Sequence, residues 1–323
     1  MTSVVQILSR RNWGLVRYNA VFQNLAALLY LGLVHKIDNL DFFLFVLRFA
    51  AFSTCLTAYG YFVNDLADVG LDQRHHKPNA FLNISRPVAR LIVAFFLLAG
   101  LALALPFQNR PGFAAILVLW VLLSSAYSLP PLRWKERGGL GLAASVLSQQ
   151  TLPVILLFLA FAPAWDWGAL IFVGFATLRG LCSDVSHQLR DYPDDRQTHT
   201  RTYVVECGEK RGAAVYAVSL EASALFTGLV LGWLIVSVPD LRVGGLYLHF
   251  SPIWPVMLLY LTLLGLTVGR AWRAYRQGTL PQVDPYNERR QMGPRDGLHW
   301  MHHSLPSVIL PLWLACIAGV YYP

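Results

Sequence analysis

The sequence contains a series of apolar runs that are each long enough to cross a bilayer. A helix needs about 20 predominantly apolar residues to span roughly 30 Å of hydrocarbon. Of the 323 residues, 55% are hydrophobic and 14% are charged, which is typical of a polytopic membrane protein. Nine runs meet this length, approximately residues 13–34, 42–63, 88–107, 112–129, 140–162, 169–188, 213–238, 253–273 and 305–322. We therefore predict one all-α membrane domain of nine transmembrane helices over residues 1–323.

The distribution of Lys and Arg predicts the orientation of these spans. With nine spans, the N-terminus and the loops after the second, fourth, sixth and eighth spans share one side, which carries most of the basic residues. The other side carries Lys36, Arg110 and Arg242. By the positive-inside rule the first side is cytoplasmic, and we expect a bacterial inner-membrane protein. The net charge of +8 is thus explained by topology, so we do not expect nucleic-acid binding.

Three carboxylates lie at the cytoplasmic end of the second span. The stretch reads Asn64-Asp65-Leu-Ala-Asp68-Val-Gly-Leu-Asp72 and is called the first acidic motif (residues 64–72). On a helix, at about 100° per residue, the three aspartates fall within roughly 60° of one another. Such a face repels itself unless a cation binds to it.

A second acidic motif (residues 184–195) follows the sixth span. Asp184, Asp191 and Asp195 are spaced i, i+7 and i+11, which again gives approximately one helical face. Aligning Asp68 and Asp72 with Asp191 and Asp195 superposes two halves of the chain. We therefore predict two pseudo-repeated four-helix units and a ninth helix around a central cavity, with both acidic faces at its cytoplasmic mouth.

Paired acidic faces with basic neighbours predict a metal-dependent diphosphate site. Mg²⁺ typically takes one or two protein carboxylates, keeps several waters and completes its shell with phosphate oxygens. Basic side chains then contact the remaining phosphate charge. The candidates are Arg74, Lys77, Arg86, Lys135 and Arg201.

The two motifs resemble the aspartate-rich motifs of the UbiA superfamily of intramembrane prenyltransferases. The segment Tyr127-Ser-Leu-Pro-Pro-Leu-Arg133-Trp-Lys135, here called the Tyr-to-Lys loop (residues 127–135), is similar to a third loop of that family. The resemblance covers the whole chain. One departure is His199, which follows the second motif where many members have glycine, so we expect that loop to be built differently.

The resemblance implies Mg²⁺-dependent transfer of a prenyl group from an isoprenoid diphosphate to a small or lipophilic acceptor, with release of diphosphate. The metal ligands it implies are Asn64, Asp65, Asp68, Asp72, Asp191 and Asp195. The diphosphate-binding residues are Asn64, Arg74, Lys77, Arg86, Lys135 and Arg201. The catalytic residues are Asp184, Asp191, Tyr127 and His187, with Asp184 either joining the metal site or orienting the acceptor. Polar residues within or beside the spans that would line an acceptor pocket are Arg17, Asn24, Gln149 and Gln188.

Two other functions share parts of this pattern. A UbiA-type intramembrane terpene cyclase would ionise the same diphosphate and quench the cation without a separate acceptor. A cation transporter would use the acidic helices to line an ion path, which requires a carboxylate near the bilayer midplane. The motif carboxylates lie toward the cytoplasmic ends of their predicted spans, so the transporter is the weaker alternative.

Overall fold

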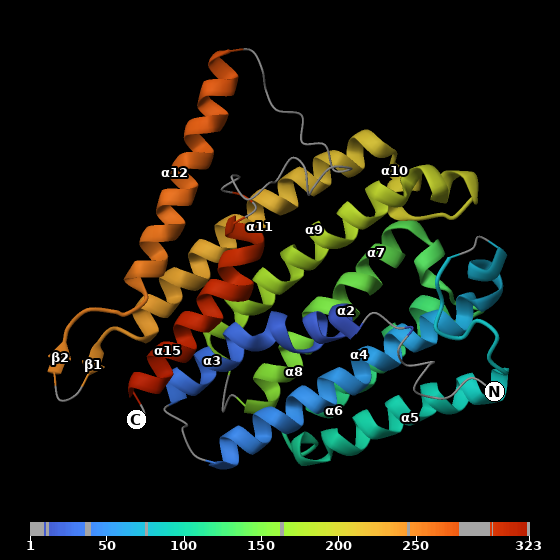
Figure 1. Cartoon of the computed structure of the whole chain (residues 1–323), viewed down its shortest axis with the longest axis horizontal. Coiled ribbons are helices and arrows are strands. Elements are labelled where there is room, and N and C mark those ends of the chain that lie inside the picture. The colour runs from blue at the N-terminus through green and yellow to red at the C-terminus, as the bar shows by residue number, and fades with distance from the viewer. Residues whose placement is uncertain are drawn as a thin grey trace. The chain divides into compact units, whose positions relative to one another are not determined.

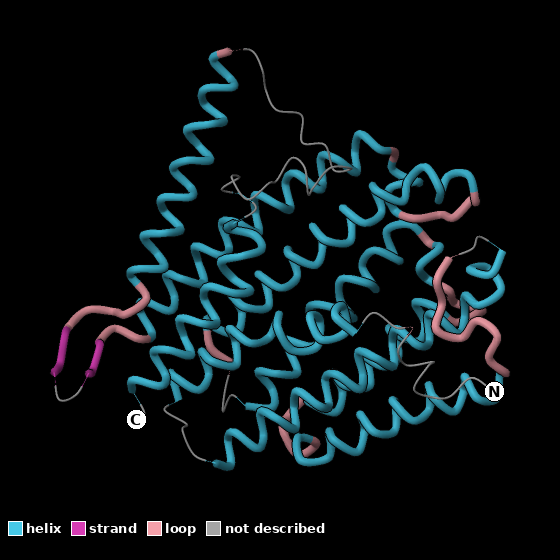
Figure 2. Tube along the Cα trace, in the orientation of Figure 1, coloured by secondary structure: helices cyan, strands magenta, loops and turns pink. Residues whose placement is uncertain are grey.

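A computed structural model of the chain describes residues 10, 13–35, 40–74, 77–161, 165–243, 246–277, 298 and 300–321. Over these residues the protein is helical apart from one short hairpin (Figures 1 and 2). Seven of the described helices are long and apolar enough to cross a membrane. Two shorter apolar helices, Tyr18–Val34 and Phe113–Ser128, lie at the predicted first and fourth spans. The protein is thus an all-helical integral membrane protein, while the count of nine spans stays a prediction.

The elements follow the chain with few interruptions, and their bounds are those used below. The helices of the first half are α2 (Trp13–Arg17), η1 (Tyr18–Phe22), α3 (Gln23–His35), α4 (Leu40–Arg74), α5 (Arg86–Ala104), η2 (Leu105–Phe107), α6 (Phe113–Ser128), η3 (Trp134–Glu136), α7 (Gly138–Val146), η4 (Leu147–Thr151) and α8 (Leu152–Phe161). The second half contains α9 (Trp167–Gln197), α10 (Tyr203–Cys207), α11 (Glu209–Ser237), β1 (Leu241–Val243), β2 (Leu246–Leu248), α12 (Trp254–Arg276), η6 (Trp300–Ile309) and α15 (Leu310–Tyr321). Of these, η1, η4 and η6 are π-helical and η2 and η3 are 3₁₀-helical.

Local sequence sets several helix starts. Ser85 is extended and Pro87 lies in the first turn of α5, where the missing N–H of proline costs nothing. Asp166 caps α9 by accepting a hydrogen bond from the Ala169 backbone N–H at 2.8 Å. Gly112 has a φ of 78°, which lets the chain reverse into α6. These signals start α5, α9 and α6 within a few residues of the starts of the predicted spans.

The chain divides into two compact units. The first comprises Met1–Asn24 and Asn39–Phe161, and the second comprises Leu25–Asp38 and Ala162–Pro323. This division differs from the predicted grouping of spans one to four and five to eight. The fifth predicted span, α7–η4–α8, belongs to the first unit because it packs against α6. The predicted duplication itself stays a prediction.

Aromatic side chains fill the core of the first unit. Helix α5 runs back along α4, as Figure 1 shows. Phe62 of α4 stacks on Phe96 of α5 with ring centroids 5.1 Å apart. Gly100 of α5 permits this approach, since a Cβ there would lie 2.6 Å from the Leu56 side chain. The acidic end of α4 is therefore carried on a tightly packed helix pair.

The second unit is organised on α9 and α11, which lie side by side (Figure 1). A segment of α3 joins this unit through Tyr30, whose hydroxyl donates to Asp166 Oδ2 at 2.8 Å and accepts from Trp233 Nε1 at 2.9 Å. The strands β1 and β2 form an antiparallel hairpin that connects α11 to α12. This arrangement presents the second acidic motif on the last turns of α9.

Candidate functional site

The first acidic motif lies on the last three turns of α4, as the spacing predicts. The residues Asp65 and Asp68 are buried, with exposed fractions of 5% and 7%, and Asp72 is half-buried. A buried carboxylate needs a paired charge or a metal ion. The burial therefore marks these aspartates as something other than solvated loop charges.

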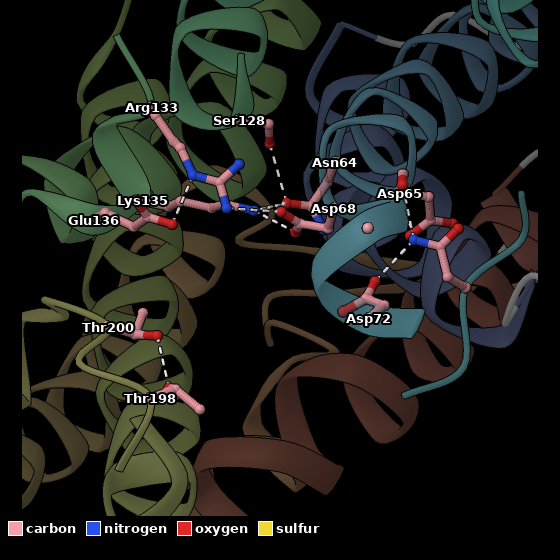
Figure 3. Close-up of polar contacts among 12 residues, drawn as sticks. Asn64, Asp65, Asp68, Asp72, Ser128, Arg133, Lys135, Glu136, Thr198 and Thr200 are labelled. Atoms are coloured by element: carbon pink, nitrogen blue, oxygen red, sulfur yellow. Dashed lines mark hydrogen bonds and ion pairs between the residues drawn. The ribbon is translucent and has the colours of Figure 1, made fainter. Parts of the chain in front are cut away.

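Two basic side chains of the Tyr-to-Lys loop pair with Asp68. Arg133 Nη2 donates to Asp68 Oδ1 at 3.0 Å, and Lys135 Nζ donates to Asp68 Oδ2 (Figure 3). Lys135 Nζ also donates to Asn64 Oδ1 at 3.0 Å, and Arg133 Nε donates to Glu136 Oε1 at 2.6 Å. The structure thus brings the predicted Lys135 onto the first motif. It adds Arg133, which lies in the quoted loop but was not predicted as a site residue.

The conformation of the loop explains how it reaches the motif. Arg133 adopts a left-handed φ of 40°, and its N–H donates to the Leu129 carbonyl at 2.9 Å. The following turn, η3, lies directly on α7 at Gly141. A Cβ at Gly141 would lie 2.5 Å from the Trp134 carbonyl oxygen, so only glycine permits this contact. The glycine therefore sets the position of Lys135 relative to Asp68.

Burial and neighbouring charges shift the pKa values of Lys135 and Arg133. Burial lowers the pKa of the Lys135 ammonium below its ordinary value, although Asp68 opposes this effect. Burial would also lower the pKa of Arg133, but the hydrogen bond to Glu136 and the charge of Asp68 raise it overall. Both cations are thus held in a partly desolvated place where they can bind a polyanion.

Asn79 ties the loop after α4 to the motif. Its Nδ2 donates to Asp72 Oδ2 and to the Asp65 carbonyl oxygen, each at 2.7 Å, and its Oδ1 accepts from the Phe81 N–H at 2.9 Å. Asn79 is not among the residues predicted for the site. Asparagine in a short loop before an apolar residue is a turn signal that could have found it.

Three of the predicted diphosphate-binding residues make no described side-chain contact with the motif carboxylates in this structure. Arg74, Lys77 and Arg86 are exposed. Within the described ranges no ion pair joins them to the motif carboxylates, and Arg74 Nε donates to the Gly70 carbonyl at 3.1 Å. Their predicted roles therefore stay predictions, without a contact that supports them.

A pocket of about 220 Å³ adjoins the first motif inside the first unit. Its walls come from α4, α6 and η4, and they include the predicted residues Asn64, Tyr127 and Gln149. The full lining is Leu56, Thr57, Gly60, Tyr61, Asn64, Trp120, Ser124, Tyr127, Ser148 and Gln149. Arg17 is not among them, because it is exposed and donates to the Trp13 carbonyl at 3.3 Å.

The second acidic motif occupies the end of α9 in the second unit. Asp184 and Asp195 are partly buried, and Asp191 and His187 are exposed, with His187 contacting Arg190 through Nδ1. The carboxylates are on one helix, as predicted. Their roles in catalysis and metal binding stay predictions.

Two predicted residues of the second unit have local partners. Gln188 Oε1 accepts a hydrogen bond from the Val204 N–H at 3.2 Å, which ties α9 to α10. Arg201 Nη2 pairs with Glu206 Oε1 at 3.0 Å. These contacts give both side chains a structural role beside the predicted one.

The turn after the second motif corrects one expectation. His199 adopts a left-handed φ of 56°, the conformation that glycine would favour, so the loop is not built around a different backbone. The Thr198 N–H donates to the Asp194 carbonyl at 2.9 Å, and the hydroxyls of Thr198 and Thr200 hydrogen-bond at 2.9 Å (Figure 3). These bonds fix the turn and offset the strain at His199.

The first motif fits Mg²⁺ in the manner expected for a diphosphate enzyme. In the described part of the chain no group of three His, Cys, Asp or Glu side chains forms a complete metal cage. Mg²⁺ does not require one, since it is commonly held by one or two carboxylates and by substrate phosphates. Asp65 and Asp68 are buried carboxylates on consecutive turns of α4, and Arg133 and Lys135 contact Asp68, so the donor set present is of the kind that Mg²⁺ and a phosphate would need.

Known structures share this fold. A UbiA homologue from Archaeoglobus fulgidus bound to GPP and Mg²⁺ is 15% identical, with a TM-score of 0.56 over 95% of this chain and 99% of that chain. The homologue bound to DMAPP and Mg²⁺ gives 15% identity and a TM-score of 0.57, over 94% and 96% of the two chains. A structure of digeranylgeranylglyceryl phosphate synthase gives 15% identity and a TM-score of 0.51, over 94% and 97%. At this identity the likeness shows the fold.

Sequence comparison gives the family. A search of curated proteins found no significant match. The profile of the UbiA prenyltransferase family, in contrast, matches residues 24–284, which include both acidic motifs and the Tyr-to-Lys loop. The chain therefore belongs to the UbiA prenyltransferase family.

Proposed function

We propose that this protein transfers a prenyl group from an isoprenoid diphosphate to a small or lipophilic acceptor inside the membrane and requires Mg²⁺. Family membership supports the reaction class, and the related structures bound to GPP or DMAPP with Mg²⁺ support the donor. The observation that carries the proposal is the pairing of buried Asp68 with Arg133 and Lys135 beside a pocket.

The residues of the first unit have distinct roles in this proposal. Asn64, Asp65, Asp68 and Asp72 hold Mg²⁺, and Lys135 with Arg133 binds the diphosphate. When bound, Mg²⁺ would supply positive charge to the departing diphosphate. Arg133 and Lys135 add two fixed cations at the same place, where negative charge develops as the carbon–oxygen bond breaks. In the second unit, Asp191 and Asp195 hold metal in the same way.

The pocket wall serves the organic part of the reaction. Breaking the carbon–oxygen bond leaves a cation-like allylic carbon, which the aromatic faces of Tyr127 and Trp120 can stabilise. The acceptor nucleophile bonds to this carbon and loses a proton. His187 and Asp184 are the proposed groups for orienting the acceptor or taking that proton.

The charge distribution supports an orientation. We place both motifs and the Tyr-to-Lys loop on the cytoplasmic side of a bacterial inner membrane, because the basic residues cluster on that side of the predicted topology. A soluble diphosphate product would then be released into the cytoplasm.

Turnover of a purified sample tests the reaction. The protein is incubated with prenyl diphosphates and Mg²⁺, with and without a membrane lipid extract that supplies the acceptor, and diphosphate and organic products are measured. We expect acceptor-dependent diphosphate release and a prenylated product. A cyclised hydrocarbon formed without any acceptor would replace this proposal with the terpene cyclase.

A further inference from the structure

A cluster of neutral polar side chains lies inside the first unit, one turn before the first acidic motif. Asn19 Nδ2 donates to the Tyr61 hydroxyl at 2.7 Å, and Gln150 Nε2 donates to Asn19 Oδ1 at 3.5 Å. Gln23 Nε2 donates to the backbone carbonyl of Gln149 at 3.0 Å, and the side-chain Nε2 of Gln149 donates to Ser145 Oγ at 2.9 Å. The polar cluster comprises Asn19, Gln23, Tyr61, Gln149 and Gln150, which join η1, α3, α4 and η4 through uncharged groups.

Two π-helical turns supply much of the polar cluster. Asn19 belongs to η1, and Gln149 and Gln150 belong to η4. π-Helical turns within α-helices are rare and frequently occur at functional sites. Both turns interrupt predicted membrane spans, where polar side chains are costly and usually face a cavity. Their meeting in one place indicates binding rather than packing.

Two amide oxygens, one on Gln23 of the cluster and one on the next residue, Asn24, are buried without a hydrogen-bond partner among the described residues. Asn24 is only 1% exposed, and neither its Oδ1 nor Gln23 Oε1 accepts a hydrogen bond from any described residue. An unpaired buried acceptor destabilises the fold unless a ligand or water donates to it. A ligand with hydrogen-bond donors would satisfy these oxygens.

The cluster opens onto the pocket described above. Tyr61 and Gln149 belong to both, and Ser148 and Ser124 add hydroxyl groups to the wall. None of the described residues that line this pocket is charged. An anionic headgroup in this pocket would lose its hydrating water and would find no positively charged side chain in the wall to replace it. A hydroxyl group would also lose water, but it could form hydrogen bonds with the amide groups of the wall instead.

We propose that the pocket and the polar cluster bind the headgroup of the acceptor, and that this headgroup is uncharged and donates hydrogen bonds. A neutral phenol or alcohol fits this description, and a carboxylate or phosphate does not. Arg17, the one cation predicted for the acceptor pocket, is exposed and bonded to the Trp13 carbonyl. This inference rests on the proposed function for the identity of the ligand as an acceptor.

A matched pair of product-like probes tests the inference without requiring turnover. The probes are 3-geranyl-4-hydroxybenzyl alcohol and 3-geranyl-4-hydroxybenzoate, which share ring and chain and differ in charge. Their affinities are measured by titration calorimetry on the purified full-length protein in lipid nanodiscs. We expect the neutral probe to bind about tenfold more tightly, because the carboxylate must be desolvated.

Substitutions in the polar cluster test whether the difference in affinity between the two probes arises there. Gln149→Leu and Tyr61→Phe should each weaken the neutral probe about fivefold, the typical effect of one neutral hydrogen bond, and leave the carboxylate probe less affected. Thr54→Val is the matched control, since its hydroxyl bonds the Ala50 carbonyl on α4 outside the pocket lining. Thr54→Val should bind both probes as the wild type does.

The remaining outcomes separate this inference from the proposed function. Equal affinities, tighter carboxylate binding, no binding of either probe, or an unchanged preference in both variants would overturn the neutral headgroup. Binding of geranyl diphosphate with Mg²⁺ is titrated in the same wild-type sample. Its absence would overturn the proposed function, whereas its presence beside equal probe affinities would overturn the headgroup inference and leave the donor site intact.

Discussion

At the scale of single residues, Asp68 is the carboxylate that pairs with two basic side chains. This carboxylate is buried on α4 and pairs with both Arg133 and Lys135. Truncating one partner of such a group leaves the others buried and uncompensated. The residues around Asp68 should therefore be more sensitive to substitution than exposed charges on the same helix.

The Asp68→Asn variant should lose diphosphate release by at least about a hundredfold, because an amide binds Mg²⁺ poorly and no longer offsets the two cations. The measurement is the initial rate of diphosphate release with saturating Mg²⁺. Asp41→Asn, an exposed carboxylate at the start of the same helix, is the control and should keep the wild-type rate. A wild-type rate in Asp68→Asn would remove this residue from the site.

Lys135 should give the reaction an alkaline limit. Burial lowers the pKa of its ammonium, so the free enzyme loses this proton, and with it the proposed contact to phosphate, at a lower pH than an exposed lysine would. We expect kcat/KM for the donor to fall with rising pH, and to do so at a lower pH than the titration of an exposed lysine would give. Lys135→Arg should move the fall to higher pH, and Lys210→Arg, an exposed site on α11, should not. An alkaline limit that is identical in Lys135→Arg would assign it to another group.

At the scale of elements, the short turn η3 contacts both α4 and α7 and sets the position of Lys135. It places Lys135 over the end of α4 while resting on α7 at Gly141. The backbone contact at Gly141 is so close that any Cβ must displace the turn. The position of Lys135 is therefore set by Gly141, which makes no contact with Asp68 or Asn64 among the described hydrogen bonds.

The Gly141→Ala variant should raise the KM for the donor about tenfold with a smaller change in kcat, since the turn moves away while the carboxylates stay. Steady-state kinetics with varied donor concentration measures this, and thermal unfolding reports the fold. Gly232→Ala on α11 is the control, because a Cβ there meets nothing within 4 Å. Unchanged donor kinetics in Gly141→Ala would show that the turn tolerates the displacement.

The sequence predicted some of these elements and missed others for physical reasons. Apolar length and the spacing of Asp65, Asp68 and Asp72 are local properties, so both the helices and the acidic face of α4 could be predicted. Arg133 was missed because a basic residue in a membrane loop is usually a topology signal, and its left-handed φ cannot be read from composition. The π-helical turns η1 and η4 lie inside apolar runs, and no local sequence pattern distinguishes them from the α-helix on either side.

At the scale of the whole molecule, the two compact units do not follow the predicted repeat. The sequence alignment pairs the acidic ends of the second and sixth spans, but it carries no information on which neighbour the fifth span packs against. That choice depends on the side chains of α6 and α8, so the grouping of helices required a structure. The family and the membrane class needed no such information and are confirmed.

The orientation of the molecule can be tested in intact cells. Lys77→Cys and Arg110→Cys are introduced separately after replacing Cys55, Cys182, Cys207 and Cys316. A membrane-impermeant maleimide added to bacterial spheroplasts should label Arg110→Cys and not Lys77→Cys, because these exposed residues lie on opposite sides of the predicted topology. Permeabilised cells, in which both should react, provide the control. The reverse labelling pattern would invert the molecule in the membrane.

The ion pairs at Asp68 also bear on how the donor would bind. Asp68, Glu136, Arg133 and Lys135 form a connected set of two anions and two cations, so their formal charges cancel. The two basic side chains of the Tyr-to-Lys loop are thus charge-balanced by carboxylates of the protein itself in this structure. If these residues bind the donor as we propose, Mg²⁺ and the diphosphate would take over the partners that Asp68, Arg133 and Lys135 give one another in this structure.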